Sequence, residues 1–398
     1  MIVSRGRPRP PDTPMLSPVP FPPHPAPCTL RPAPLHPLTN MRILINPPLH
    51  YPDGTMTTRK YLTFGEGAAS ADAGRRPIVR VVGVGGAGCN IVDRLAGSGL
   101  PHVEAVAVNT DAQNLVGLRC RKILIGKTTT GGRGAAGVPE TGEAAAGSDL
   151  ERIGGALKGT EVLFLLSGLG GGTGTGASPV IARAAREAGA LVVALTVHPF
   201  RAEGRTRNLA ARVGLERLRD EADVVVVVHN DKLVRDFPHM NFPDALKVAD
   251  HLLLHPVRSI TQLLTREDLP NLRKVLQIRD IALLGFGESS VHLGPRSVIR
   301  DAVDSLMPEG DISGHDRALA VIHCPPGYGE DELHRFIREL HLFIHLDAQI
   351  MWGPIADPAL KDEVRIMTIV GRARERPGGP AGPATVVEPL PDGHGPEI

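Results

Sequence analysis

The chain has 398 residues, of which 42% are hydrophobic and 22% are charged, and its formal net charge at neutral pH is +1. This length and apolar content suffice for two folded domains, while the balanced charge gives no argument for a nucleic-acid ligand or an anionic membrane surface. Four cysteines without a C-x-x-C pair indicate neither a disulfide framework nor a zinc knuckle, and no apolar run reaches membrane-spanning length. We therefore expect a cytoplasmic protein that binds no nucleic acid.

Both ends of the chain are rich in proline and glycine. Residues 1–76 begin with an aperiodic, proline-dense run, which favours an extended, disordered arm over a packed core. Residues 374–398 are typical of a flexible tail. The sequence leaves open whether translation starts at Met1 or later, at Met41 or Met56. Both ends are therefore excluded from the fold prediction.

Apolar runs alternate with helical segments between residues 77 and 242. The six predicted strands are 78–84, 104–109, 122–126, 161–168, 191–197 and 224–230. Helices are expected near 87–97, 140–158, 177–188 and 203–219. Continuously apolar strands that alternate with helices indicate a parallel sheet covered on both faces. Such a sheet is typical of a nucleotide-binding domain.

A long helical segment follows this first domain, and a smaller α/β domain follows the helix. We assign residues 243–274 to the central helix and the loop after it, with the helix itself at about 243–264. Residues 275–373 form the second domain, with elements at 281–289, 295–306, 318–325, 329–345, 348–355 and 363–371. The predicted fold class is α/β, with a parallel-sheet nucleotide-binding domain, a long central helix and a smaller C-terminal α/β domain.

Four loops that follow predicted strands are rich in glycine or carry Asn, Asp and Thr. They read GVGGAGCN (83–90), NTDAQNL (109–115), TTTGGRGAAGVPETG (128–142) and GLGGGTGTGASP (168–179). In an open α/β sheet the ligand lies outside the carboxyl ends of the strands, where these loops would meet. Bare glycine backbone at a helix N-terminus favours an anion, above all phosphate. The fourth loop has no Walker-type lysine and does not follow the first strand, as a dinucleotide fingerprint would.

These loops and several further segments resemble the FtsZ/tubulin family. The segments that carry the resemblance are VVGVGGAGCNIVDRL, AVNTDAQNL, GVPETG, GLGGGTGTGASP, VHPFRAEGRTR, VVHNDKL, DALKVADHLL and AQIMWGPIADPALKDEVRIMTI. They occur in the order and spacing of an FtsZ, from about Pro77 to Ala373. The resemblance implies an FtsZ/tubulin-like fold that binds GTP or GDP, with Mg²⁺ as a further candidate ion. It also implies head-to-tail filaments that act in cell division, in the cytoplasm at the division site.

The resemblance also implies which residues contact the nucleotide. Backbone N–H groups would hold the phosphates at Gly85, Gly86, Gly88, Gly170, Gly171, Gly172, Thr173, Gly174, Thr175 and Gly176. Side chains would hold the ribose and phosphate side at Glu203 and Arg207, and the guanine at Asn90, Asn230 and Asp250. An aspartate carboxylate can accept hydrogen bonds from both the N1–H and the 2-amino group of guanine, and adenine has no such pair of donors. Glu203 with Arg207 also fits an ordinary i,i+4 helix pair, and Asp250 fits a solvated helix residue.

Some positions depart from the family pattern. Leu246 stands where a phenylalanine usually stacks on the guanine, which should weaken stacking by ~1 kcal/mol. Ala136 occupies a glycine position of the third loop, which should loosen the grip on the terminal phosphate. Membrane attachment is expected to be indirect, through an adaptor, although the adaptor-binding peptide of bacterial FtsZ proteins is not visible in the tail. The i,i+4 histidine pairs 251/255 and 341/345 lack an evident third ligand, so we expect no protein metal site.

The loop after the central helix departs most. In the family, the next subunit of the filament donates acidic residues of an NLDFAD-like segment that polarise the attacking water. With Asn271 and Leu272 aligned to the start of that motif, both acids are missing and Arg273 and Lys274 follow at once. Three interpretations are open. The catalytic acids could be Glu267 or Asp268 just upstream, Arg273 could act as an arginine finger, or the chain binds GTP and hydrolyses it weakly, which we prefer.

Two other functions fit parts of the sequence. A regulatory paralogue would bind GTP and co-assemble with other FtsZ-like subunits without hydrolysing it. A nicotinamide-dependent oxidoreductase would use GVGGAG as its dinucleotide loop, but Asn109 stands where the acidic ribose ligand belongs and the second glycine loop would be unexplained. Nucleotide specificity tests the oxidoreductase, and turnover with and without assembly tests the paralogue.

Overall fold

A computed structural model of the chain describes residues 49–50, 56–57, 62–63, 76–236, 242–306 and 311–374. The predicted arm and tail lie outside these residues, apart from three short strands. The three are β1 (Leu49–His50), β2 (Met56–Thr57) and β3 (Leu62–Thr63). None of the helices in the described ranges is long and apolar enough to cross a membrane.

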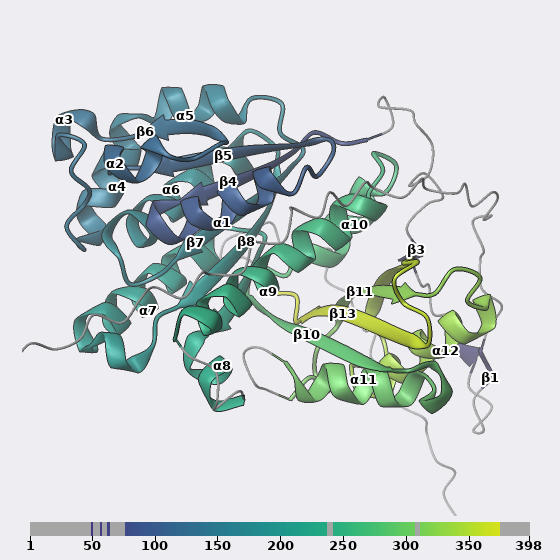
Figure 1. Cartoon of the computed structure of the whole chain (residues 1–398). Helices are drawn as coiled ribbons and strands as arrows, with labels where there is room; N and C mark the ends of the chain where they lie inside the picture. Colours follow the sequence, from purple (N-terminus) through teal and green to yellow (C-terminus); the bar gives the residue numbers. More distant parts are fainter. Residues whose placement is uncertain are drawn as a thin grey trace, which may run out of the picture. The chain divides into compact units, whose positions relative to one another are not determined.

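The first part of the fold alternates strands with helices (Figure 1). Its strands are β4 (Val79–Val84), β5 (Val103–Asn109), β6 (Arg121–Leu124), β7 (Val162–Gly168), β8 (Leu191–His198) and β9 (Val224–His229). Its helices are α1 (Gly85–Gly97), α2 (Ala112–Val116), α3 (Lys127–Thr130), α4 (Pro139–Ser148), α5 (Leu150–Leu157), α6 (Gly172–Glu187), η3 (Arg201–Glu203), α7 (Arg205–Glu221) and α8 (Asn230–Asp236). Every pairing among these six strands is parallel.

The long helix and the second part follow. Their helices are α9 (Phe242–Leu263), α10 (Leu269–Leu276), η4 (Val291–Leu293), α11 (Pro295–Asp304) and α12 (Glu330–His341). Their strands are β10 (Ile281–Ser290), β11 (Arg317–Cys324), β12 (Gln349–Ala356) and β13 (Glu363–Gly371). In this part β13 runs antiparallel to both β10 and β11. The predicted α/β fold class, with its parallel sheet, long helix and smaller α/β domain, is confirmed.

One sheet runs through both parts. Its strand order is β3-β12-β11-β13-β10-β9-β8-β7-β4-β5-β6. The two parts join where β10 pairs in parallel with β9, through Ile281 opposite Val225 and Ala282 opposite Val226. The sequence does not predict this junction, because the two strands are separated by the whole of α9 and α10.

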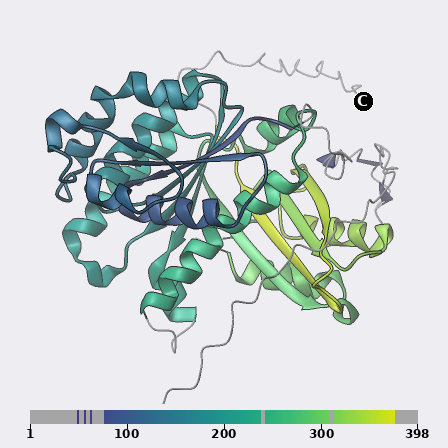
Figure 2. The same ribbon diagram turned by 45° about the horizontal axis from the view of Figure 1, so that its top comes forward.

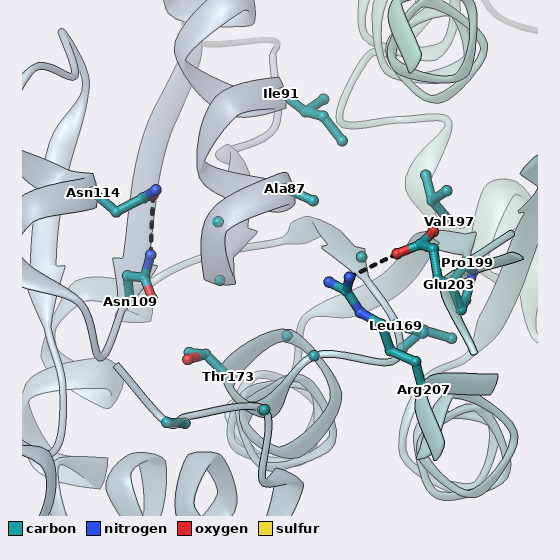
Figure 3. Close-up of a pocket in the computed structure, with 18 of the residues that line it drawn as sticks. Ala87, Ile91, Asn109, Asn114, Leu169, Thr173, Val197, Pro199, Glu203 and Arg207 are labelled. Carbon is teal, nitrogen blue, oxygen red and sulfur yellow. Dashed lines mark hydrogen bonds and ion pairs between the residues drawn. The ribbon is translucent and has the colours of Figure 1, made fainter. Parts of the chain in front are cut away.

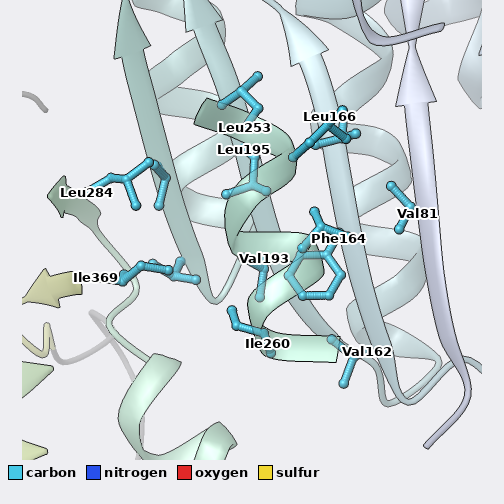
Figure 4. Packing of buried hydrophobic residues seen from close by; sticks show 14 of the residues in the cluster. Val81, Val162, Phe164, Leu166, Val193, Leu195, Leu253, Ile260, Leu284 and Ile369 are labelled. Atoms are coloured by element: carbon cyan, nitrogen blue, oxygen red, sulfur yellow. The ribbon is translucent and has the colours of Figure 1, made fainter. Parts of the chain in front are cut away.

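The strands are buried on both faces because valine, leucine and alanine fill both sets of alternating positions. One face packs on α1, α9 and α10 through a cluster that includes Val81, Phe164, Leu195, Leu253 and Ile260 (Figure 4). The other face of the sheet is also covered by helices (Figure 2). These are α4, α5, α6 and α7, which pack on it through a cluster that includes Val82, Leu165, Ile153, Ile181 and Leu218. The first cluster continues to Leu284 and Ile369 of the second part, so α9 packs against strands of both parts.

Three local differences separate the structure from the sequence prediction. The helix expected at 140–158 breaks at Asp149, whose carboxylate accepts a hydrogen bond from the backbone N–H of Gly126 at 2.7 Å. Helix α6 begins at Gly172, earlier than its apolar periodicity indicates, because its first turn is made of glycine and threonine. Residues 269–274, expected as a loop, belong to α10, which runs to Leu276 and buries Leu269, Leu272 and Leu276.

Candidate functional site

A pocket of about 420 Å³ opens at the carboxyl edge of the parallel strands. Loops after all six strands from β4 to β9 contribute to its lining, together with the first turns of α9. Two walls of the pocket differ in chemistry. The glycine wall consists of Gly85, Gly86, Gly134, Gly137, Gly171, Gly172 and Gly174. The α8–α9 wall consists of Asn230, Leu246, Ala249 and Asp250.

Two long helices present uncapped N-termini to the glycine wall. The residue before α1 is Val84 and the residue before α6 is Gly171, and neither residue has a polar side chain that could cap the helix that follows. The first N–H groups of each helix therefore have no cap from the preceding residue and carry the positive end of the helix dipole. A Cβ added at Gly171 would meet no atom within 4 Å, so this glycine faces open space. The wall is thus suited to an anion.

The predicted loop glycines have two different surroundings. Of the sequence-predicted set, those that line the pocket are Gly85, Gly86, Gly171, Gly172 and Gly174. Three others do not line it, namely Gly88, Gly170 and Gly176. A Cβ at Gly88 would collide with the carbonyl of Leu166, and one at Gly176 with the carbonyl of Pro139. These positions need glycine so that helices can approach their neighbours closely.

The two threonines of the same loop also differ. Thr173 lines the pocket, and its Oγ1 lies 2.6 Å from Oγ1 of Thr110. Thr175 does not line it, because its Oγ1 accepts a hydrogen bond from the N–H of Gly170 at 2.8 Å. Thr175 therefore holds the shape of the loop, and Thr173 is available to a bound group.

The ion pair expected from the sequence forms at the edge of the pocket. Nη1 of Arg207 lies 2.7 Å from Oε2 of Glu203, and both residues line the pocket (Figure 3). The other oxygen of Glu203 accepts from the N–H of Phe200 at 2.9 Å. The pair is therefore anchored to the loop after β8.

Burial also sets the protonation of two histidines beside this pair. His198 and His229 end the neighbouring strands β8 and β9, and their rings stack at 5.0 Å. Burial lowers the pKa of both imidazoles. They therefore add no positive charge next to the pocket at neutral pH.

The second and third loops supply lining residues that the sequence analysis did not assign. From the second loop come Asn109, Asp111 and Asn114, and from the third Ala135 with Gly134 and Gly137. Nδ2 of Asn109 donates to Oδ1 of Asn114 at 3.1 Å (Figure 3). Asp111 caps α2 by accepting from Gln113 N at 2.9 Å. The signal was present, because NTDAQNL follows a strand, but a polar loop does not reveal which side chains turn inward.

Ala136 has the conformation that its place in the third loop suggests. Its φ is +49°, in the left-handed region, between Gly134 and Gly137, which also have positive φ. An alanine costs about 1 kcal/mol there relative to its preferred conformations. The loop beside the pocket is thus strained at this residue.

Three predicted base contacts have different surroundings. Asn230 is 4% exposed, lines the pocket, and has an Oδ1 without a hydrogen-bond partner in the described part of the chain. Asp250 lines the pocket and forms an ion pair with Arg94. Asn90 is exposed on α1 and does not line the pocket. Leu246, at the expected stacking position, lines the pocket and is 37% exposed.

The candidate catalytic acids lie away from this pocket, after α9. Glu267 is exposed. Asp268 is 4% exposed, and its Oδ2 accepts from both the N–H and Oγ1 of Thr265, at 2.9 and 2.6 Å. Their catalytic role stays a prediction, which would require a second subunit.

Arg273, the candidate arginine finger, bonds within its own chain. Its Nη2 donates to the carbonyl of Gly189 at 2.6 Å and to that of Glu161 at 3.2 Å, at the amino edge of the sheet. Arg273 also lines a second cavity at this edge, beside Asp223, whose pKa is raised by burial. These bonds tie α10 to the entries of β7 and β8.

The residues of the pocket fit a nucleoside phosphate. The glycine wall offers backbone N–H groups at two helix N-termini, and Asn230 offers a buried amide oxygen that has no partner among the described residues. The charged lining residues are Asp111, Glu203, Asp250 and Arg207, so the lining side chains are net acidic. Within the described residues, no group of three His, Cys, Asp or Glu side chains could hold a metal ion. A metal ion at this site would therefore depend on ligands from a bound phosphate and water.

Two family models match the chain. The model described as Tubulin/FtsZ family, GTPase domain, matches residues 78–237, and that described as FtsZ family, C-terminal domain, matches residues 280–373. Cell division protein FtsZ 1 of Archaeoglobus fulgidus is 40% identical over 301 residues, which cover 74% of this chain and 82% of that protein. Cell division protein FtsZ 1 of Halobacterium salinarum is 41% identical over 298 residues, which cover 73% and 75%.

The chain is also similar to solved structures of FtsZ and CetZ proteins. An empty FtsZ dimer from M. jannaschii has a TM-score of 0.70 and 34% identity, covering 77% of this chain and 96% of that one. A GTPγS-bound protofilament of CetZ2 from Haloferax volcanii has a TM-score of 0.65 and 25% identity, covering 74% and 93%. With both family models matched in order and relatives near 40% identity over most of their length, this chain belongs to the Tubulin/FtsZ family.

Proposed function

We propose that this protein binds GTP and GDP in the pocket at the carboxyl edge of the sheet and assembles head to tail into filaments that act in cell division. The observation that carries the proposal is one pocket in which two uncapped helix N-termini face Asn230 and Asp250. The glycine wall would hold the phosphates. The carboxylate of Asp250 would accept hydrogen bonds from guanine, which adenine cannot donate.

We propose Mg²⁺ as a companion of the triphosphate. The lining side chains are net acidic, so a polyphosphate needs a source of positive charge beyond Arg207 and the helix dipoles. Mg²⁺ keeps several waters and is usually held by phosphates and one or two carboxylates. Asp111 could take part, because it lines the pocket beside Gly134, where an added Cβ would lie 3.9 Å from its Oδ2.

Self-association is supported by the relatives, which include an FtsZ dimer and a CetZ2 protofilament. A head-to-tail contact that does not close generates an open filament. We place the filament in the cytoplasm at the division site, attached to the membrane indirectly through an adaptor, and other FtsZ-like subunits could join it. Within each subunit, residues 77–242 would bind the nucleotide, 243–274 would form the connecting helix and loop, and 275–373 the C-terminal domain.

We further propose that GTP hydrolysis is weak. Of the two acids near the end of α9, Asp268 is poorly suited to the task because it is buried against Thr265, which leaves Glu267 as the exposed one of the two. Arg273 is bonded to backbone carbonyls of its own chain. A GTPase without its completing group turns over on the order of 10⁻³ s⁻¹ or slower.

Nucleotide binding by the Asp250→Ala variant tests the guanine assignment. Loss of two hydrogen bonds to a charged acceptor should weaken GTP binding about 30-fold or more, with ATP binding unchanged. Asp244→Ala is the matched control, since Asp244 lies on the same helix, pairs with Lys247 and does not line the pocket. Equal binding of GTP and ATP by the unmodified protein would refute the guanine assignment.

Phosphate release, measured together with sedimentation of filaments, tests the hydrolysis proposal. We expect assembly with GTP, slow release, and little change in Glu267→Ala or Asp268→Asn. The asparagine keeps an acceptor for Thr265, so a folding defect is avoided. Brisk release that depends on assembly and is abolished by either change would show that these acids are catalytic. Assembly without any release would favour the non-hydrolysing paralogue.

A further inference from the structure

The carboxylate of Asp250 is held by a residue from another helix. Nη1 of Arg94, in the last turn of α1, forms an ion pair with Oδ2 of Asp250 on α9. The Asp250 side chain is 17% exposed and that of Arg94 is 50% exposed. Asp250 lines the pocket whereas Arg94 does not. The guanidinium thus reaches the carboxylate from outside the pocket.

The chemistry of the pair leaves room for a ligand. A carboxylate has about four acceptor positions, so one bond from Arg94 leaves enough for the two donors of a guanine edge. A charged partner also holds the carboxylate in one orientation before the base arrives, which lowers the ordering cost of binding. Without Arg94, the Asp250 side chain would have to be ordered by the base itself.

The pair also connects the two walls of the pocket. Helix α1 contributes Gly85 and Gly86 to the glycine wall at its N-terminus and Arg94 at its other end. Asp250 belongs to the α8–α9 wall. Helix α1 therefore positions the carboxylate that would read the base, and the N-terminus of the same helix would face the phosphates.

We infer that Arg94 is a positioning residue for base recognition, which orients the carboxylate of Asp250 toward the N1–H and 2-amino groups of guanine. This inference rests on the proposed function, because it assumes that Asp250 reads the base. An ion pair this exposed contributes little to folding stability, so Arg94 can be replaced without unfolding the protein.

A second ion pair on the same helix provides a matched control. Asp93, next to Arg94, pairs with Arg119 at 3.2 Å, and the Arg119 and Asp93 side chains are 63% and 20% exposed. These values resemble those of the Arg94–Asp250 pair, but neither residue lines the pocket. Arg119→Gln therefore removes a comparable surface pair and leaves the base-reading carboxylate untouched.

The experiment compares binding of GTP, ITP and ATP by the full chain and its Arg94→Gln, Arg94→Lys and Arg119→Gln variants. ITP lacks the 2-amino group, so the ratio of GTP to ITP affinity reports how well the carboxylate is aimed at both donors. Arg94→Gln should weaken GTP binding by about fivefold to tenfold and ITP binding less, so that the ratio falls. Arg94→Lys should restore most of it, and Arg119→Gln should behave like the unmodified chain.

An Asp250→Ala background completes the test. There Arg94→Gln should cause no further loss of GTP affinity, because the residue acts only through the carboxylate. An unchanged GTP-to-ITP ratio, an equal effect of Arg119→Gln, or tighter GTP binding by Arg94→Gln would each overturn the inference, the last by showing that the pair blocks the site. No preference for GTP over ATP in the unmodified chain would overturn the proposed function with it.

Discussion

In its glycine wall the pocket presents backbone to a ligand, whereas in its α8–α9 wall it presents side chains. The glycine wall is built from loops that follow the strands of the sheet. Two of these loops lead directly into α1 and α6, whose N-termini are uncapped. The other wall collects Asn230, Leu246 and Asp250 from two helices, and Arg94 of a third helix pairs with Asp250 from outside the pocket.

Because of this difference, the two walls should have separate roles in nucleotide recognition. Backbone N–H groups bind phosphate without regard to the base, so the glycine wall should set the affinity for every nucleoside triphosphate. Side chains distinguish the edges of bases, so the α8–α9 wall should set the ratio of affinities. Substitutions in the two walls should therefore change different quantities.

The largest effect is expected at Gly171. A valine there has a sterically allowed backbone, with φ −92°, and its side chain would enter the open space where the ligand binds. Binding of GTP and ATP should fall together by about 100-fold or more, since contacts to charged phosphate are lost.

Gly117→Val is the control for this prediction. Gly117 has φ −83° and open space around a Cβ, but it does not line the pocket. Gly174 is a poorer choice for the test, because a Cβ there would collide with the carbonyl of Gly168 and disturb the fold. If valine at Gly171 changed only the ratio of GTP affinity to ATP affinity, the two walls would not have the separate roles proposed here.

The stability of the fold around α9, which carries most of the α8–α9 wall, should depend on pH. The reason is that neutral histidines hold α9 to the second part of the fold. Oγ of Ser259 lies 3.2 Å from Nδ1 of His255 on α9 and 3.1 Å from Nε2 of His323 on β11. Burial and nearby positive charges lower the pKa of His255 to about 3. Of the titratable or charged groups around the two rings, His251, Arg258 and Arg365 add to the lowering of the His255 pKa, and Asp357 opposes the lowering of the His323 pKa.

The sign of the effect follows from this lowered pKa. The unfolded chain takes up a proton near pH 6.5 and the folded chain does so only near pH 3, so stability is full above pH 6.5 and is lost as the pH falls below it. We expect His255 to lower the free energy of unfolding by about 2 kcal/mol between pH 7.5 and pH 5. Urea unfolding of the chain and of His255→Gln at both pH values measures this loss. His102→Gln, which replaces an exposed histidine, is the reference variant. If the free energy of unfolding changed equally with pH in the unmodified chain and in His255→Gln, His255 would be excluded as the cause.

A smaller effect is expected from Leu246→Phe. An aromatic ring at this partly exposed position would stack on the base, which should strengthen binding by about 1 kcal/mol, or about fivefold. Stacking is available to every base, so GTP and ATP affinities should rise together and their ratio should stay constant. A rise confined to GTP in equilibrium titrations would show that Leu246 affects the aim of Asp250 as well.

The same contrast explains what the sequence could predict. The six strands and the glycine loops are local patterns, so their positions follow from short windows of residues. The split between α4 and α5 at Asp149 depends on a bond to Gly126, and the pairing of β9 with β10 joins distant residues. Neither has a local signal.

Within the site, residue type alone did not separate binding from packing. Gly88 and Gly176 occur in the same motifs as Gly171, yet helix packing requires them and they do not line the pocket. The sequence contains no local signal for the role of Arg94, because its partner Asp250 lies on another helix far along the chain. A motif identifies a loop, and the three-dimensional contacts decide which of its residues reach the ligand.

The smallest effect is expected from Ala136→Gly in the third loop, between two residues of the glycine wall. Glycine relieves the left-handed strain at φ +49° but makes the unfolded chain more flexible, so the two contributions nearly cancel and stability should change by less than about 0.5 kcal/mol. If the loop holds the terminal phosphate, relief of strain beside Ala135 and Gly137 should favour GTP over GDP by about twofold to threefold, because GDP lacks that phosphate. His102→Gly is the matched control, since His102 also has positive φ, at 63°, but lies between α1 and β5, outside the third loop. Equal gains for GTP and GDP in competition titrations would mean that the third loop contacts the phosphates common to both, and that the terminal phosphate is held by the loops at α1 and α6 alone.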